Sequence, residues 1–294
     1  MNIKSIIKSF SDERWNIGFL ENTLDSVMRG DKIRVKWMKH HLKNSWFADP
    51  FILDVTDDEI IVLVEEFYKP IHRGRISRLT IDKKSLNLKK LDVVLELPTH
   101  LSFPVIIRPQ EKTDFVYLMP ENGESGELIT YQYWPKENHI EKCETVLKEA
   151  VADAIPFEFN GTTYLFATNG NNVNGNELSI YQWDDDTHQY IFDRTLVFEE
   201  NVARMAGNCF MYQGDMYRPT QECNVQYGHA VTIQKIRMEN NHWSFEEIRR
   251  MYSVNPILNI GMHTFNMHKG MIVTDALGFD NMWFRTILKT LHIL

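Results

Sequence analysis

A hairpin-like pattern recurs five times along this sequence, and it constrains the possible fold more than any other feature. Each copy has a short apolar strand, a turn of polar residues or glycine, and a second apolar strand that ends in a polar residue. The copies begin near residues 48, 101, 151, 204 and 261, at intervals of about fifty residues. The third copy turns at Asn160-Gly161, a strong hairpin signal.

Further strand-like segments follow the first four copies, at residues 73–82, 127–134, 177–183 and 229–238. Their alternation of apolar and polar residues is typical of half-buried antiparallel strands. Four strands in about fifty residues describe one propeller blade, whereas no long helical periodicity separates the copies. The sequence therefore predicts an all-β fold, a five-bladed β-propeller that forms one domain over residues 1–294. The alternative, two packed sandwiches, would not need the same opening motif in every copy.

The two ends of the chain carry their own predictions. The fifth copy has room for only two or three strands, and a ring has to close because open sheet edges invite aggregation. We therefore expect an N-terminal strand, near Trp15–Phe19 or Ile33–Trp37, to complete the last blade. Apolar residues from Trp283 to Leu291 recur at helical spacing and predict a short amphipathic C-terminal helix. We expect this helix to pack on the domain, and contact with a membrane surface is the alternative.

Composition excludes several classes of function. The formal net charge of −8 argues against a nucleic-acid partner, because a backbone binder needs clustered Lys and Arg. The three cysteines form no short pair, so neither a disulfide framework nor a zinc site is expected. The N-terminal residues lack the apolar core of a secretory signal, and we expect a cytoplasmic protein. The sequence contains no P-loop, no G-x-G-x-x-G dinucleotide-binding motif and no G-x-S-x-G hydrolase motif. No cofactor is expected.

Polar residues at the blade openings are the candidate site, because the innermost strands of a propeller start at one mouth of its axis. Three carboxylates, Asp49, Asp153 and Glu222, are the candidates for catalysis. The candidates for substrate binding, taken from the starts and ends of these strands, are His100, Ser102, Glu66, Glu121, Arg204, Arg218, Gln221, Tyr227 and His263. A metal-binding role for His100 and His263 is an alternative, but no metal is expected because a single His at a strand start is more often a hydrogen-bonding residue.

Convergent carboxylates in one pocket have a chemical meaning. Cleavage or transfer of a glycosyl group needs one protonated carboxyl and one ionised carboxylate, and neighbouring charge can keep both forms present near neutral pH. Carboxylates at strand ends also cap turns and form structural ion pairs with residues such as Arg204 and Arg218. From the residues alone, both interpretations stay open.

The blade openings also resemble a known family. WFADPFI (46–52), HLSFPVI (100–106), ARMAGNCF (203–210), YRPTQECNVQYGHAV (217–231) and GMHTFN (261–266) are similar to the N-terminal propeller domain of plant glucosamine inositolphosphorylceramide transferases. That domain is in turn similar to the five-bladed arabinanase, levansucrase and invertase glycosidases. The resemblance implies that Asp49 is a base or nucleophile, that Asp153 stabilises the transition state, and that Glu222, in a Glu-Cys pair, is the acid.

Three functions remain in consideration. The first is an enzyme that acts on a glycosidic linkage through paired carboxylates. The second is a non-catalytic module that recognises a glycan or nucleotide-sugar in polysaccharide or glycolipid biosynthesis; two arginines near the pocket would favour a ligand with a phosphate or carboxylate. The third, a protein-interaction propeller, ranks last. The expected partner is a carbohydrate or another sugar-containing small molecule.

Overall fold

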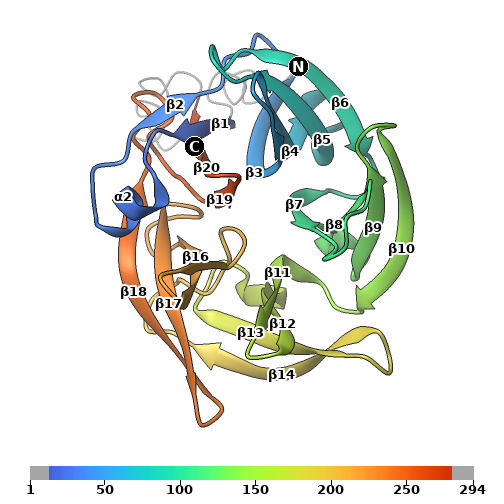
Figure 1. Cartoon of the computed structure of the whole chain (residues 1–294), viewed down its shortest axis with the longest axis vertical. Coiled ribbons are helices and arrows are strands. Elements are labelled where there is room, and N and C mark those ends of the chain that lie inside the picture. Colours follow the sequence, from blue (N-terminus) through green and yellow to red (C-terminus); the bar gives the residue numbers. More distant parts are fainter. Residues whose placement is uncertain (1–12, 280–294) are drawn as a thin grey trace, which may run out of the picture.

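The computed structural model describes residues 13–279, which form five four-stranded antiparallel sheets arranged radially around a central axis (Figure 1). The predicted five-bladed β-propeller is therefore confirmed. The amphipathic helix predicted for the C-terminus lies outside the described residues.

Each blade runs from an inner strand at the axis to an outer strand at the rim, and blades 1 to 4 follow the chain order. Blade 1 comprises β3 (Ser45–Val55), β4 (Glu59–Tyr68), β5 (Arg73–Asp82) and β6 (Leu88–Leu95). Blade 2 comprises β7 (Ser102–Ile107), β8 (Val116–Glu121), β9 (Leu128–Trp134) and β10 (His139–Leu147). Blade 3 comprises β11 (Val151–Phe159), β12 (Thr162–Asn169), β13 (Glu177–Asp184) and β14 (Gln189–Val197). Blade 4 comprises β15 (Phe210–Tyr212), β16 (Asp215–Glu222), β17 (Ala230–Glu239) and β18 (His242–Tyr252).

Blade 5 joins the two ends of the described chain. Its inner strands are β19 (Phe265–His268) and β20 (Met271–Phe279), and its outer strands are β1 (Glu13–Leu20) and β2 (Val35–Trp37). Strand β1 pairs with β20 from Glu13↔Phe279 to Phe19↔Val273, and both expected N-terminal segments thus lie in this blade. The pairing covers the outer edge of β20 and closes the ring.

Helices are short connections in this fold. A single turn of α-helix, α2 (Leu24–Met28), lies between β1 and β2, and its first turn is capped by the Thr23 hydroxyl. Three 3₁₀ turns occupy hairpin connections: η1 (Lys69–Ile71), η2 (Gly123–Ser125) and η3 (Gly170–Asn172). Within the described ranges, none of the helices is long and apolar enough to cross a bilayer.

Apolar side chains fill the spaces between neighbouring blades. Phe51 of blade 1 meets Phe103 of blade 2 edge to face, with 5.1 Å between ring centroids. Trp243 of blade 4 packs its ring edge-on against Phe166 of blade 3, at 5.4 Å. Such contacts hold each sheet against the next, so the positions of the inner strands are set by packing along the whole ring.

The inner strands of three blades share an unusual backbone feature where they open. Asp49, Phe103 and Asp153 all have positive φ, at 50°, 44° and 47°. In each strand the pairing register shifts directly after this point, which marks a β-bulge. A non-glycine residue in this left-handed region costs conformational energy, and the recurrence shows that the fold specifies it.

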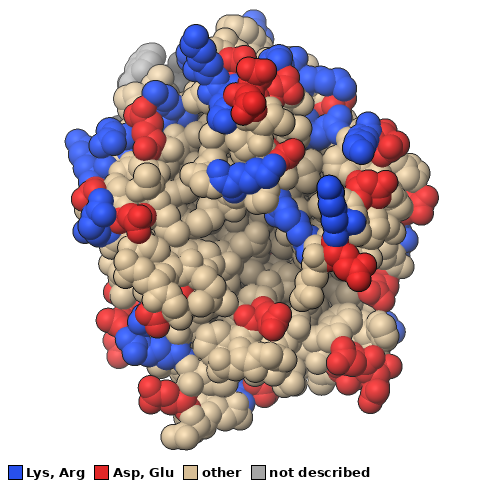
Figure 2. All heavy atoms as spheres, in the orientation of Figure 1, with Lys and Arg blue, Asp and Glu red and all other residues tan. Residues whose placement is uncertain are grey.

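Charged side chains of both signs are interspersed around the rim of the molecule, and its centre is hollowed (Figure 2). The net negative charge is thus not gathered into one continuous patch on the face in view.

Candidate functional site

A cavity of about 240 Å³ lies at the axis, where the blade openings converge. We call it the axial pocket. Seven residues predicted for the site line it: Asp49, His100, Ser102, Glu121, Arg204, Tyr227 and His263. The remaining lining residues are Glu13, Trp15, Trp46, Ala48, Glu65 and Phe67.

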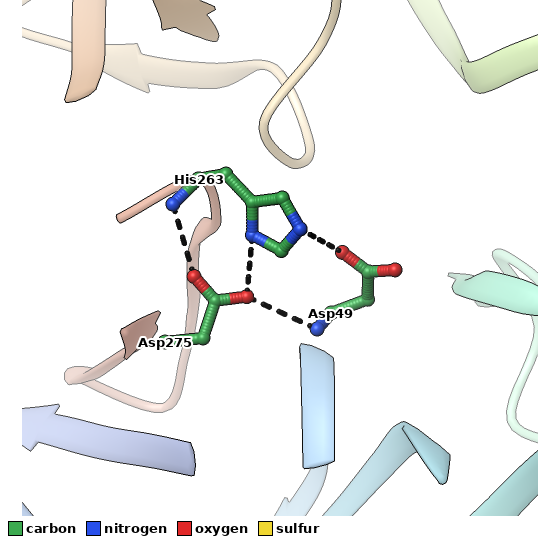
Figure 3. Close-up of side chains that lie close together, drawn as sticks. All are labelled: Asp49, His263 and Asp275. Atoms are coloured by element: carbon green, nitrogen blue, oxygen red, sulfur yellow. Dashed lines mark hydrogen bonds and ion pairs between the residues drawn. The ribbon is translucent and has the colours of Figure 1, made fainter. Parts of the chain in front are cut away.

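Asp49 and His263, which line the pocket, form a cluster with the fully buried Asp275 (Figure 3). The imidazole Nδ1 of His263 lies 2.7 Å from Asp275 Oδ2, and its Nε2 lies 3.4 Å from Asp49 Oδ1. Asp275 also accepts the backbone N–H groups of Asp49, His263 and Thr264. All three side chains of the cluster are almost fully buried.

Burial and the charges within the cluster shift the pKa values of its three members. Burial alone would lower the pKa of His263, but the charges of Asp275 and Asp49 outweigh it and raise that pKa to about 9. For Asp275, burial acts to raise the pKa, and the nearby His263 more than offsets it, so the pKa is lowered. Burial raises the pKa of Asp49 well above its usual value, against the opposing effect of His263. The His263 imidazole therefore keeps its proton at neutral pH and lies between the carboxyl groups of Asp275 and Asp49.

The same three residues are the group among the described ones with the spacing of a metal site, because their ligand atoms lie within 4.8 Å of one another. Both imidazole nitrogens, however, face a carboxylate oxygen. A metal ion would have to displace the proton that holds the cluster together, and the cluster is already satisfied by internal contacts.

Asp153 is the centre of a second polar cluster beneath the pocket. Its Oδ2 accepts hydrogen bonds from Arg204 Nε at 2.6 Å and from Gln221 Nε2 at 2.5 Å. Its backbone N–H donates to Glu121 Oε2 at 3.0 Å. Arg204 also reaches Asn174 Oδ1 at 2.8 Å and stacks over the Tyr227 ring. Asp153 and Gln221 are therefore buried behind the lining residues rather than in them.

Glu121 and Glu65 are two further carboxylates of the pocket lining, and Glu13 is a third. Burial, with the neighbouring charge of Asp153, raises the pKa of Glu121 to about 8. Glu65 Oε1 lies 3.1 Å from His100 Nε2, while His100 Nδ1 accepts the backbone N–H of Gly74 at 3.0 Å. The hydrogen bond to Glu65 raises the pKa of His100, and burial opposes it.

Aromatic rings form the other surface of the pocket. Trp46 and Phe67 are paired across β3 and β4, and their rings stack at 4.8 Å with an interplanar angle of 6°. Trp15 stacks on His263 at 4.1 Å, and Tyr227 meets the same imidazole edge-on at 5.3 Å. Trp46 and Phe67 remain partly exposed, and one face of each ring is covered by the other.

Three predicted site residues lie elsewhere. Glu66 follows Glu65 on β4 and points away from the pocket, where Ser45, Arg75 and Ser77 satisfy its carboxylate. Arg218 is fully buried beside Gln234 and the Phe245 ring. Glu222 follows Gln221 on β16 and accepts from the Asn224 N–H at 2.7 Å, with His229 Nδ1 at 2.6 Å. Successive residues of a strand point to opposite faces of the sheet, so Glu66 and Glu222 face away from the side to which Glu65 and Gln221 point.

The pocket lining and the buried cluster also contain residues outside the predicted set, among them Glu65, Asp275, Trp15 and Phe67. Glu65 and Asp275 lie in second strands of the repeated hairpin, β4 and β20, so their position along the chain signalled them. Trp15 had no comparable signal, because it enters the pocket from the strand that closes the ring.

The described residues form a five-bladed β-propeller whose axial pocket is lined by acids from the blade openings. Similar folds include a GH43 β-xylosidase/α-arabinofuranosidase from a compost microbial metagenome (TM-score 0.54, 12% identity, 82% of this chain and 93% of that one). A family 117 glycoside hydrolase from Zobellia galactanivorans is also similar (TM-score 0.50, 10% identity, 91% and 90% covered). Identities this low establish the shared fold alone.

The family is established by sequence. The profile described as glucosamine inositolphosphorylceramide transferase 1, N-terminal, matches residues 35–270, and the chain belongs to this family. Glucosamine inositolphosphorylceramide transferase 1 of Arabidopsis thaliana is 24% identical over 274 residues, which cover 84% of this chain and 34% of that protein. The protein of the same name from Oryza sativa subsp. japonica is 26% identical over 208 residues, covering 66% and 26%. The chain thus spans about a third or less of the length of these relatives.

Proposed function

We propose that this protein recognises a carbohydrate by binding one sugar unit in the axial pocket. The proposal rests on one observation. The partly exposed, stacked rings of Trp46 and Phe67 line the same cavity as the carboxylates of Glu65 and Glu121. A sugar ring presents apolar C–H faces and a rim of hydroxyls, and such a pocket complements both. The volume of about 240 Å³ is below the range common for larger ligands, so it favours a single ring.

The contacts of the acids favour binding over cleavage. Asp49 accepts the Phe103 N–H through Oδ2 and faces His263 and Thr264 through Oδ1, so both oxygens are engaged. Asp153 is held by Arg204 and Gln221. Glu222 does not line the pocket, and Gln221 occupies the inward-facing position beside it. A glycosidase needs two carboxyl groups free to face the scissile bond, and this trio does not present them.

The family supports a carbohydrate ligand in general terms. The name of the curated relatives describes a transferase for glucosamine and inositolphosphorylceramide. A propeller that holds a sugar-containing donor or acceptor would suit an assembly that joins the two. This supports recognition without assigning the transfer chemistry to the described residues.

A second candidate function is cleavage or transfer at a glycosidic linkage, with Glu121 in place of Glu222 as the proton donor. The observation that favours it is the raised pKa of Glu121, about 8, because a carboxyl that keeps its proton near neutral pH can act as a general acid. Asp49 would then be the ionised partner, and its contact with His263 would favour that state, because the imidazole charge lowers the Asp49 pKa that burial raises.

Calorimetric titration with a panel of monosaccharides that includes glucosamine tests the proposal. We expect saturable binding that weakens at least tenfold in Trp46→Ala, because the stacking surface is lost. Glu65→Gln, which keeps the side-chain shape, should also weaken binding, and Phe192→Ala, an exposed aromatic on β14, should leave it unchanged. Binding that is equally strong in Trp46→Ala and the parent would contradict the proposal. Turnover of aryl glycosides that disappears in both Glu121→Gln and Asp49→Asn would instead favour the second candidate.

A further inference from the structure

A second cavity, of about 480 Å³, lies between blades 2 and 3. Blade 2 lines it with residues from all four of its strands, among them Tyr117 of β8 and Glu144 of β10, and blade 3 contributes Thr163, Trp183 and Tyr190. We call it the interblade cavity. The blade 3 residues flank the turns after β11 and β13, at the end of the blade opposite to its opening at the axis. The interblade cavity therefore shares no lining residue with the axial pocket.

A β-bulge in β10 shapes one wall of the interblade cavity. The pairing of β10 with β9 skips from Lys142 to Thr145, so Cys143 and Glu144 both lie opposite Thr130. Successive residues of a regular strand point to opposite faces, yet Cys143 and Glu144 both line the cavity. The Thr130 hydroxyl donates to the backbone carbonyl of Glu144 at 3.4 Å and holds the bulge. The irregularity thus adds a carboxylate to a wall that a regular strand would not give it.

The other walls are apolar and aromatic. Trp183 and Tyr190 are cross-strand partners on β13 and β14, and their rings meet edge to face at 5.0 Å between centroids. Trp183 is partly exposed, as is Tyr117 across the cavity on blade 2. Ile107 and Met119 add aliphatic surface between them. Such a lining complements a flat apolar ring, and the cavity volume lies within the range of small-molecule sites.

Tyr190 brings a hydroxyl that the protein itself does not use. The side chain is 8% exposed, and its hydroxyl has no hydrogen-bond partner among the described residues. Burial raises the pKa of Tyr190, so the hydroxyl keeps its proton at neutral pH. A buried tyrosine hydroxyl normally has a partner, and this one lines a cavity in which a ligand can supply it.

The charge of the interblade cavity has one sign. Glu144 is the single formally charged residue among the described residues that line it, and its carboxylate makes no ion pair or hydrogen bond with another described side chain. A cationic group is attracted to this carboxylate, and it is also attracted to the faces of Trp and Tyr rings. An anionic ligand would meet repulsion from the same carboxylate.

We propose that the interblade cavity binds a small aromatic amine. The ring lies against Trp183 and Tyr117, the ammonium group faces Glu144, and a ring N–H or hydroxyl of the ligand bonds to the Tyr190 hydroxyl. A sugar is disfavoured here, because its rim of hydroxyls needs more hydrogen-bonding groups than this largely apolar lining offers. The site is separate from the axial pocket, so it does not depend on the function proposed above.

Ligand-observed NMR titration of the full chain tests the proposal with four probes: tryptamine, 1-methyltryptamine, indole-3-propionate and glucosamine. Tryptamine carries both the ammonium group and the ring N–H, 1-methyltryptamine lacks the ring N–H, and indole-3-propionate replaces the ammonium group by a carboxylate. The variants are Tyr190→Phe and Glu144→Gln. Their matched controls are Tyr252→Phe, at a position that is 50% exposed on β18, and Glu141→Gln, at an exposed position of β10. Thermal unfolding establishes that each variant is folded.

We expect tryptamine to bind saturably and at least threefold more tightly than indole-3-propionate, a preference of the size that an exposed charge pair provides. Glu144→Gln should remove this preference, and Glu141→Gln should keep it. Tyr190→Phe should weaken tryptamine binding about fivefold and leave 1-methyltryptamine unaffected, because a single hydrogen bond is lost. No saturable tryptamine binding, or equal effects of each variant and its control, would overturn the proposal. Glucosamine binding that is lost in Glu144→Gln would overturn it in favour of a second sugar site.

Cys143 provides a readout in the unmutated protein. Its thiol is exposed and lines the interblade cavity, so a bound ligand should shield it. Saturating tryptamine should slow the alkylation of Cys143 by iodoacetamide at least threefold, measured by mass spectrometry of its peptide, with Cys209 as the internal reference. An unchanged rate of Cys143 alkylation would contradict binding in this cavity, even if tryptamine binds elsewhere on the protein.

Discussion

The imidazole of His263, from blade 5, faces the carboxylate of Asp49, from blade 1, with 3.4 Å between Nε2 and Oδ1. Asp275 Oδ2 lies 2.7 Å from the other imidazole nitrogen, Nδ1, and also accepts the Asp49 backbone N–H at 3.1 Å. The contact therefore joins the first and last blades of the ring at the wall of the axial pocket. The same side chains that line the candidate site also hold the closure of the propeller.

This relationship predicts a pH dependence of stability. The pKa of His263 is about 9 in the folded protein and about 6.5 when unfolded, so its stabilising contribution is complete below about pH 6.5 and is lost as the pH rises to about 9. His263→Gln should be destabilised relative to the parent by on the order of 3 kcal/mol at pH 6, and this difference should shrink toward pH 9. Urea unfolding across this pH range measures the difference. A constant gap between the two proteins would show that the imidazole does not carry a proton in the folded state.

The Arg204–Asp153 pair predicts a large cost when its cation is removed. Both side chains are at least nine-tenths buried, and Arg204→Met would leave Asp153 with Gln221 as its remaining hydrogen-bond donor. We expect a loss of about 3–5 kcal/mol, measured by urea unfolding. The matched control is Arg237→Met, since Arg237 pairs with Glu246 on the exposed surface and should cost less than about 1 kcal/mol. Similar losses in both variants would show that the buried pair contributes no more to stability than the exposed pair does.

Glu121 predicts a second loss of stability with rising pH, in a lower pH range than that of His263. Its pKa is raised from 4.5 to about 8, so the folded state holds a proton that the unfolded chain releases, and the parent loses stability as the pH rises through this window. Glu121→Gln should remove this loss and be more stable than the parent at pH 8 by up to a few kcal/mol. Thermal unfolding in a pH series checks it, with Glu158→Gln at an exposed position of β11 as the control. A variant that is less stable than the parent at pH 8 would mean that the carboxylate is ionised and paired.

We predict that the stability of the propeller depends on the packing of strand β1 in blade 5. Ile17 is fully buried within this strand and is paired with Asp275 of β20. Ile17→Ala should lower the free energy of unfolding by about 2–5 kcal/mol, because a cavity opens between blades. Ile191→Ala, at a position that is 49% exposed on β14, should change it by less than about 0.5 kcal/mol. Equal effects in denaturant titrations would argue against a structural role for β1.

Much of the architecture was accessible from the sequence because the blade openings repeat. The hairpin with its turn signal recurs in every blade, and a fold of five similar units has to place the openings together. Asp49, Glu121, Arg204 and His263 were selected on this basis, and the structure brings all four to the axial pocket.

The errors of side-chain direction have one physical cause. Strands β4 and β16 are buried on both faces over most of their length, so neither shows the alternation that reveals which residues point inward. A shift of one residue then exchanges the faces. Glu66 was chosen where Glu65 lines the pocket, and Glu222 was expected where Gln221 reaches Asp153. The strand that a residue belongs to was predictable, but the face to which it points was not.

The pairing of β1 with β20 has a consequence for how the chain acquires its structure during synthesis. Of the described strands, β1 is made first, yet its inner neighbour is made last, so no local contact can complete blade 5. Until β20 is made, β1 has β2 as its paired neighbour and its other edge lacks the native partner, and contacts between such distant segments form slowly. The contact between Asp49 and His263 can therefore form only after both of these distant segments have been synthesised, and the same holds for the axial pocket, whose lining includes both residues.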